Sequence, residues 1–194
     1  TKVGAHLNKM ISYEAFTEYS EARKLCEIDL VNLKILVPFE FLADNIGISR
    51  YLEAFLDYGW TVCVKLRPIE DEDTDSDRYA FSKKVREKAN FVYELSDTEL
   101  ASFSAVICTQ SIFAVEMMRF SVPIWYLETS VPFLSNIVRA GIAQFVTMNL
   151  ISKFDQKETL RPFLNPIYTD SHYHSVFSDI SMDTFLLTEL LENS

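Results

Sequence analysis

The chain has 194 residues, of which 48% are hydrophobic, and a formal net charge of −10 at pH 7. This length and apolar content suit one large domain, or one domain with extensions, around a sizeable core. The acidic balance argues against broad binding to nucleic acid or to an anionic membrane, whereas a small anionic ligand needs only a local positive site. No apolar run approaches the ~20 residues of a membrane span and no signal peptide opens the chain, so we expect a cytoplasmic protein, with peripheral membrane association left open. Three cysteines without the spacing of a metal site fit buried, reduced thiols: Cys26, Cys63 and Cys108.

The first half of the chain predicts a strand–helix–strand unit. Residues 33–39 form a short apolar run typical of a buried strand, and Ser49 is the expected N-cap of the helix that follows. That helix should end at Gly59, and a second strand at 60–67 is stopped by Pro68. Short connections of this kind imply a right-handed parallel crossover.

The same alternation continues through the second half. After a helix at 76–89 and a third strand at 91–95, Ser96 and Glu99 have the spacing of a capping box that begins a short helix. The remaining segments are a fourth strand at 104–109, a helix at 112–120, a fifth strand at 122–127, a helix at 133–140 and a sixth strand at 144–147. This alternation predicts an α/β fold with a Rossmann-like, doubly wound, mainly parallel six-stranded sheet and helices on both faces.

The sequence divides into three parts. These are an N-terminal helical extension or linker at 1–31, the Rossmann-like domain at 32–150 and a C-terminal helical tail at 151–194. Amphipathic helices are expected at about 11–27 and 183–192, and a further helical stretch at 152–164. Because both ends carry large aromatic residues, we expect them to pack against the outside of the sheet domain.

Several familiar motifs are absent or incomplete. The chain has no G-x-G-x-x-G, no G-x-x-x-x-G-K-[ST] and no G-x-S-x-G, which removes the usual dinucleotide, P-loop and hydrolase signals. The acidic run at 70–77 resembles the start of a calcium loop, but neither possible register supplies the glycine and glutamate that such a loop needs. His172 and His174 have no third ligand at a suitable spacing. We therefore expect solvated loops in both places and no metal site.

Charged and hydroxyl side chains gather where the predicted sheet would bind a ligand. Lys65 and Arg67, two apart at the end of a strand, should point to one face at the carboxyl edge of the sheet, where open α/β sheets hold ligands. Ser111 begins the central helix, whose first N–H groups suit a phosphate, and Glu116 could accept both hydroxyls of a ribose. The plainer alternatives are solvated strand-end cations, a helix N-cap and an exposed helix residue.

The order of these segments resembles the C-terminal domain of GT-B glycosyltransferases, over residues 33–150. Within that superfamily, Lys-x-Arg-Pro at 65–68 is similar to the K-x-H-P of bacterial capsule sialyltransferases and CDP-glycerol glycerophosphotransferases. The motifs that carry the resemblance are Phe-Val-Tyr-Glu-Leu at 91–95, Ser-Asp-Thr-Glu-Leu at 96–100, Ala-Val-Ile-Cys-Thr-Gln-Ser at 105–111, Glu116, and Val-Pro-Ile at 122–124. The chain departs from the family pattern at three positions, with Arg67 for His, Ser104 for Asp and Ser121 for Gly.

The resemblance implies a site for a nucleotide-sugar donor linked to CMP, CDP, UDP or GDP. Ser111 would contact the donor phosphates together with Lys65 or Arg67, Glu116 would hold the ribose, and no metal would be needed. Leu95 and Ser96 would lie beside the base. The full implied set is Lys65, Arg67, Leu95, Ser96, Thr109, Gln110, Ser111 and Glu116.

A complete GT-B enzyme has two such domains with the active site between them, and this chain has room for one. The resemblance therefore implies the donor-binding domain of a transferase of surface polysaccharide or glycoconjugate synthesis, with the acceptor site on an N-terminal domain or a separate partner. A single-domain relative without catalysis is equally compatible. Two alternatives stay open: an isomerase like the nucleotide-sugar 2-epimerases, and a non-catalytic interaction module with the same fold.

Overall fold

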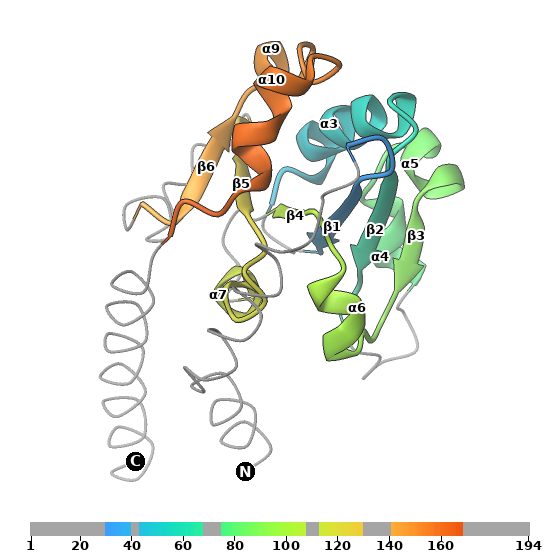
Figure 1. Ribbon diagram of the computed structural model, residues 1–194. Helices are drawn as coiled ribbons and strands as arrows, with labels where there is room; N and C mark the ends of the chain where they lie inside the picture. Colours follow the sequence, from blue (N-terminus) through green and yellow to red (C-terminus); the bar gives the residue numbers. More distant parts are fainter. Residues whose placement is uncertain (1–29, 40–42, 68–74, 108–112, 130–140, 169–194) are drawn as a thin grey trace, which may run out of the picture.

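The computed structural model describes residues 30–39, 43–67, 75–107, 113–129 and 141–168. These residues form one six-stranded sheet in the order β3-β2-β1-β4-β5-β6, with every neighbouring pair parallel (Figure 1). The strands are β1 (Lys34–Pro38), β2 (Thr61–Lys65), β3 (Asn90–Val92), β4 (Ala105–Ile107), β5 (Ile124–Leu127) and β6 (Ala143–Val146). The fold is therefore the open, all-parallel, Rossmann-like α/β sheet that the alternation of segments predicts, with each strand within a few residues of its expected place.

The strand order reverses once along the sheet. From β1 the chain adds β2 and β3 on one side, and it then returns to add β4, β5 and β6 on the other. The order reverses between β1 and β4, and open α/β sheets bind their ligands beside the carboxyl ends of the strands at such a reversal. A ligand site is therefore expected at the connections that follow β1, β2 and β4.

Helices cover both faces of the sheet (Figure 1). The described helices are α3 (Asn45–Asp57), α4 (Asp75–Tyr79), α5 (Lys83–Lys88), α6 (Asp97–Ala101), α7 (Phe113–Met118), α9 (Met148–Ile151), α10 (Lys157–Leu160) and the 3₁₀ helix η1 (Arg161–Leu164). Successive strand residues point to opposite faces, so Ile35 and Val37 belong to one apolar cluster and Leu36 to the other. We call these the first and the second cluster.

The first cluster lies between the sheet and α3, α5, α9 and α10. Its centre is aromatic. Phe55 stacks on Trp60 with 5.3 Å between ring centroids, and Trp125 lies 5.9 Å from Phe55 and 5.7 Å from Phe154. The indole N–H of Trp125 donates to the carbonyl of Phe163 at 2.8 Å, so the one polar atom of this buried side chain is satisfied.

The second cluster lies between the opposite face and helices α6 and α7. Leu100 of α6 and Met117 and Met118 of α7 pack against strand residues that include Cys63 and Val106. Four further apolar side chains pack against this cluster and are only partly buried: Val92 at the end of β3, Leu95 in the connection after it, Ala101 at the end of α6 and Phe113 at the start of α7.

The helix after β1 begins earlier than the sequence suggests. Its N-cap is Asp44, whose carboxylate accepts the N–H of Gly47 at 2.8 Å, and the expected cap Ser49 is buried inside α3. The Ser49 hydroxyl instead donates to the carbonyl of Asn45 and accepts the N–H of Ser82. Asp and Ser are comparably good caps, so the tertiary bond to Ser82 decides between them.

The predicted helix at 76–89 is two helices. Phe81 turns into the first cluster, and the Ser82 side chain accepts the N–H of Val85 to begin α5. The predicted helical stretch at 152–164 begins with turns and is helical only from 157 to 164, in α10 and η1. In the first case the burial of one large side chain outweighs continuous helix propensity.

Some expectations lie outside the described residues: the helices at 11–27, 133–140 and 183–192, and the packing of both ends against the sheet domain. Within the described ranges, no helix combines the length and the apolar character needed to cross a bilayer.

Candidate functional site

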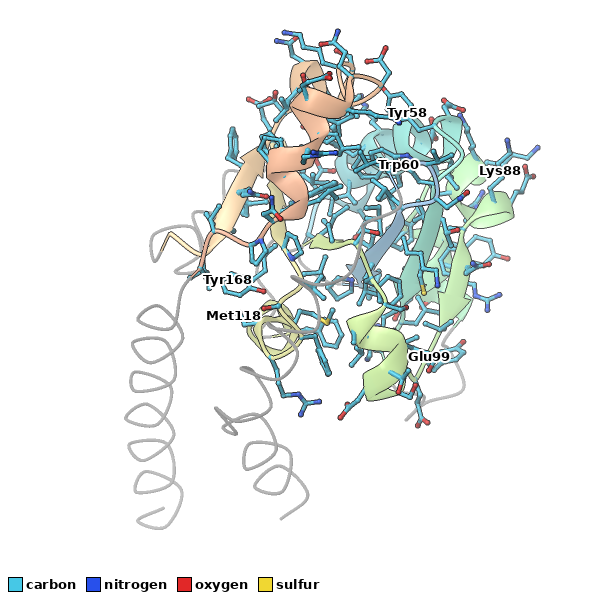
Figure 2. The ribbon with its side chains drawn as sticks, in the orientation of Figure 1. Tyr58, Trp60, Lys88, Glu99, Met118 and Tyr168 are labelled. Atoms are coloured by element: carbon cyan, nitrogen blue, oxygen red, sulfur yellow. The ribbon has the colours of Figure 1, made fainter. Side chains whose placement is uncertain are left out.

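Three strands end side by side at the carboxyl edge of the sheet. Lys65, the last residue of β2, is opposite Pro38 at the end of β1 and Val92 at the end of β3. In Figure 1 the arrowheads of β1 and β2 point toward the end of the molecule that carries α6 and α7. Figure 2 shows Glu99 and Met118 at that end, and Tyr58 and Trp60 toward the other.

Lys65 joins the end of β2 to the start of α7. Its Nζ lies 5.3 Å from the ring centroid of Phe113, the first residue of α7. Lys65 is half-buried, and within the part of the chain that the structure describes it forms no ion pair. On the face of the second cluster, a cation therefore stands beside the partly buried ring of Phe113 and opposite Val92 in the neighbouring strand.

Arg67 lies on the opposite face of the sheet, the face of the first cluster. Its Nε donates to Asp77 Oδ2 at 2.9 Å and its Nη2 to Asp77 Oδ1 at 2.6 Å. The guanidinium carbon lies 5.3 Å from the ring centroid of Phe39, a residue that packs against the first cluster. The hydrogen bond that Arg67 donates to Asp77 raises the pKa of Arg67 above its ordinary value.

The expectation that Lys65 and Arg67 share one face is therefore wrong. The alternation of side chains holds only while the strand continues, and β2 ends at Lys65. Beyond Lys65, the ion pair with the buried carboxylate of Asp77 holds the side chain of Arg67 on the first-cluster face.

Ser96 and Leu95 occupy the connection between β3 and α6. The Ser96 hydroxyl accepts the N–H of Glu99, and the Glu99 carboxylate accepts the N–H of Ser96 at 2.8 Å, so the predicted capping box is confirmed. The Ser96 hydroxyl also donates to the Glu99 carboxylate at 2.6 Å, and this bond, together with the one from the Ser96 backbone N–H, holds the pKa of Glu99 below its ordinary value. Ser96 thus fixes the start of α6, while Leu95 stays partly buried against the second cluster.

The helix that follows β1 offers no open anion site. The carboxylate of Asp44 already sits on the first N–H groups of α3. A Cβ placed on Gly47 would lie 2.3 Å from Asp44 Oδ2, so glycine at this position makes room for the cap. An anionic ligand at this helix end would have to displace a like charge.

No motif in the sequence identifies Arg119 as a residue near the predicted site. This residue follows α7, and its side chain is only 10% exposed, with Nη2 2.7 Å from Asp97 Oδ1 at the start of α6. The guanidinium carbon lies 4.5 Å from the Phe120 ring centroid. Arg119 therefore ties α7 to α6 across the second-cluster face, a partnership between distant segments that no local spacing reveals.

The turn after α7 has a conformation that glycine normally adopts. Ser121 is buried and has φ of 54°, in the left-handed region. This is the position at which the GT-B pattern has glycine. Glycine adopts this conformation without the steric cost that the Cβ of serine brings.

Part of the predicted site falls outside the description. Thr109, Gln110 and Ser111 precede the described part of α7, and Glu116 lies within α7 without a described side chain. Among the described residues, no group of three or more His, Cys, Asp or Glu side chains could hold a metal ion.

No protein-family model matches the chain, and no curated protein matches it. Among solved structures, the chain is similar to E. coli ADP-heptose LPS heptosyltransferase II, with 11% sequence identity and a TM-score of 0.41. The match covers 79% of this chain and 52% of that chain, so this chain spans about half the length of that protein. A similarity of this size supports no further argument, and the fold rests on the strand order described above.

Proposed function

We propose that this chain is the donor-binding domain of a GT-B-type glycosyltransferase of surface polysaccharide or glycoconjugate synthesis. The observation that carries the proposal is the contact between Lys65 and Phe113. It brings a cation from the end of β2 to the first residue of α7, two residues after Ser111 in the sequence. The left-handed turn at Ser121 supports the family resemblance independently.

The described side chains suit the parts of a nucleotide. Val92, Leu95 and Phe113 present partly buried apolar surface for a base, and Lys65 is the adjacent cation for a phosphate. Glu116, three residues after Phe113 in α7, would accept the hydroxyls of the ribose. A lysine and backbone N–H groups can neutralise phosphate charge, so the proposal includes no metal.

The donor in this proposal is a CMP-, CDP-, UDP- or GDP-linked sugar. The acceptor and the catalytic base would come from a second domain or a separate partner. Binding of the free nucleotide to this chain alone is therefore expected to be weak, and nucleotide binding is a more direct assay of the proposal than turnover.

Calorimetric titration with CMP, CDP, UDP and GDP tests the proposal. Lys65→Gln and Glu116→Ala should each weaken binding by about 1.5–3 kcal/mol, because each removes a charge-assisted hydrogen bond. Lys34→Gln is the matched control, since Lys34 is an exposed lysine at the amino end of β1, on the opposite edge of the sheet. It should bind like the parent.

The proposal fails if none of the four nucleotides binds the parent at millimolar concentration. It also fails if Lys65→Gln and Glu116→Ala bind as tightly as Lys34→Gln. The first result would favour the interaction module, because such a module has no nucleotide site.

A further inference from the structure

We propose that Arg67 is a positioning residue that acts through Asp77 and Phe39, and that Lys65 is the cation that meets the donor phosphate. This inference rests on the proposed function and divides its site between two neighbouring cations. The sequence pattern treats the two as equivalent, whereas their surroundings differ in every described contact.

The geometry of the ion pair binds Arg67 firmly to Asp77. Two of its nitrogens donate to the two oxygens of one carboxylate, at 2.9 Å and 2.6 Å. The Asp77 side chain is 7% exposed, whereas that of Arg67 is 53% exposed. If Arg67 turned toward a phosphate, a nearly buried carboxylate would lose its counter-charge, and that loss opposes the movement.

The second contact of Arg67 leads directly to Lys65. The guanidinium lies over the Phe39 ring, and the ring of Phe39 meets the buried Phe81 edge-on at 6.1 Å between centroids. The backbone N–H of Phe39 donates to the carbonyl of Lys65 at 2.8 Å. Arg67 therefore holds the residue that fixes the backbone of Lys65.

The contacts of Lys65 are of another kind. Among the described residues its ammonium group meets only the Phe113 ring, which leaves the positive charge without a counter-ion. A phosphate could approach it without breaking any ion pair formed among the described residues.

The test is a set of variants titrated with whichever of CMP, CDP, UDP and GDP binds the parent most tightly, at several salt concentrations. Lys65→Gln should lose most of the binding and flatten the dependence of Kd on salt, because the screened charge is gone. Arg67→Gln and Asp77→Asn should each weaken binding roughly three- to tenfold, with the parent's salt dependence retained. The exchange Arg67→Asp with Asp77→Arg should recover part of the affinity that either single change loses.

Asp77→Asn keeps the shape of the side chain and remains informative if the exchanged protein does not fold. A matched control is the exchange of Lys84 and Asp57, a more exposed ion pair at 2.6 Å between α5 and α3, which should leave nucleotide binding unchanged. Thermal unfolding of each variant identifies the folded ones.

The opposite results overturn the inference. If Arg67 contacts the phosphate, Asp77→Asn should leave binding unchanged or tighten it, and Arg67→Gln should flatten the salt dependence as Lys65→Gln does. In that outcome the parent still binds nucleotide, so the proposed function stands. If the parent binds no nucleotide, the proposed function and this inference fall together.

Discussion

The two faces of the sheet differ in the side chains that cover them. The first-cluster face is closed by a continuous aromatic core, with Phe55, Trp125 and Phe154 almost fully buried. The second-cluster face is closed over Met117 and Met118. Near the carboxyl ends of the strands both faces carry partly covered apolar side chains, such as Phe39 on the first and Phe113 on the second. The neighbouring cations differ, because Arg67 is paired with Asp77, whereas Lys65 forms no ion pair among the described residues.

Because of this difference, we expect the first-cluster face to contribute mainly to stability and the edge of the second-cluster face to contribute mainly to nucleotide binding. A fully buried aromatic cluster contributes to folding and offers nothing to a ligand, whereas half-covered apolar side chains beside a cation can still gain contacts. We therefore expect substitutions on the first-cluster face to change the free energy of unfolding, and substitutions at the carboxyl edge of the second-cluster face to change nucleotide binding.

The largest expected effect is on the first-cluster face. Trp125→Ala should lower the free energy of unfolding by about 3–5 kcal/mol, because it leaves a cavity among Phe55 and Phe154 and removes a satisfied hydrogen bond. Denaturant unfolding measures the loss. At temperatures where the variant is still folded, its nucleotide affinity should match that of the parent. Leu95→Ala should show the reverse pattern, and equal effects of both variants on binding would break the comparison between the faces.

The thiol of Cys63 tests how well the second-cluster face is closed away from its edge. Burial, with a smaller contribution from Glu99, raises the pKa of Cys63 from 9.0 to about 11. At mildly alkaline pH the thiolate population should fall about 100-fold relative to the unfolded chain. Peptide mass spectrometry after brief alkylation, with and without denaturant, measures the labelling of this one cysteine. Equal labelling in both states would show that the interior of this face is open to solvent.

A smaller change of opposite sign is expected at the turn after α7. Ser121→Gly should raise the free energy of unfolding by about 1 kcal/mol, since the strain of a left-handed serine exceeds the added flexibility of glycine in the unfolded chain. Ser121→Ala, which keeps a Cβ, is the control and should not be stabilised. A glycine variant that is less stable than the parent would remove this turn as support for the family resemblance.

The smallest effect depends on pH. Because the folded pKa of Glu99 lies below its ordinary value of 4.5, the capping box contributes stability above that value and loses it as the pH falls through the lowered pKa. The difference in Tm between the parent and Glu99→Ala should therefore be largest near neutral pH and vanish in acid. A difference that persisted in strong acid would mean that Glu99 acts without its charge.

The fold was predictable because its signals are local. Short apolar runs such as 33–39 and 122–127 cannot alternate in polarity when both faces of a strand are covered, and Ser96 with Glu99 begins α6 by contacts within one turn. The direction of every strand followed from the helices placed between them.

The errors arise where distant residues compete. Ser49 is a plausible cap in sequence, but its hydroxyl is bound by Ser82 from another helix. Arg67 has the same spacing signal as Lys65, and only the folded position of Asp77 distinguishes the two. A local pattern identifies the carboxyl edge of the sheet, whereas the division of roles along that edge depends on tertiary partners.

The most direct test of the central claim is NMR mapping of the parent as the tightest of the four nucleotides is added. The account predicts that the largest chemical-shift changes fall on Lys65, Val92, Leu95 and Phe113, at the carboxyl edge of the second-cluster face. Residues of the first cluster, such as Ile48, Val85 and Leu160, should keep their shifts. Changes centred on those first-cluster residues, or saturable binding that leaves Lys65 and Phe113 unaffected, would contradict it.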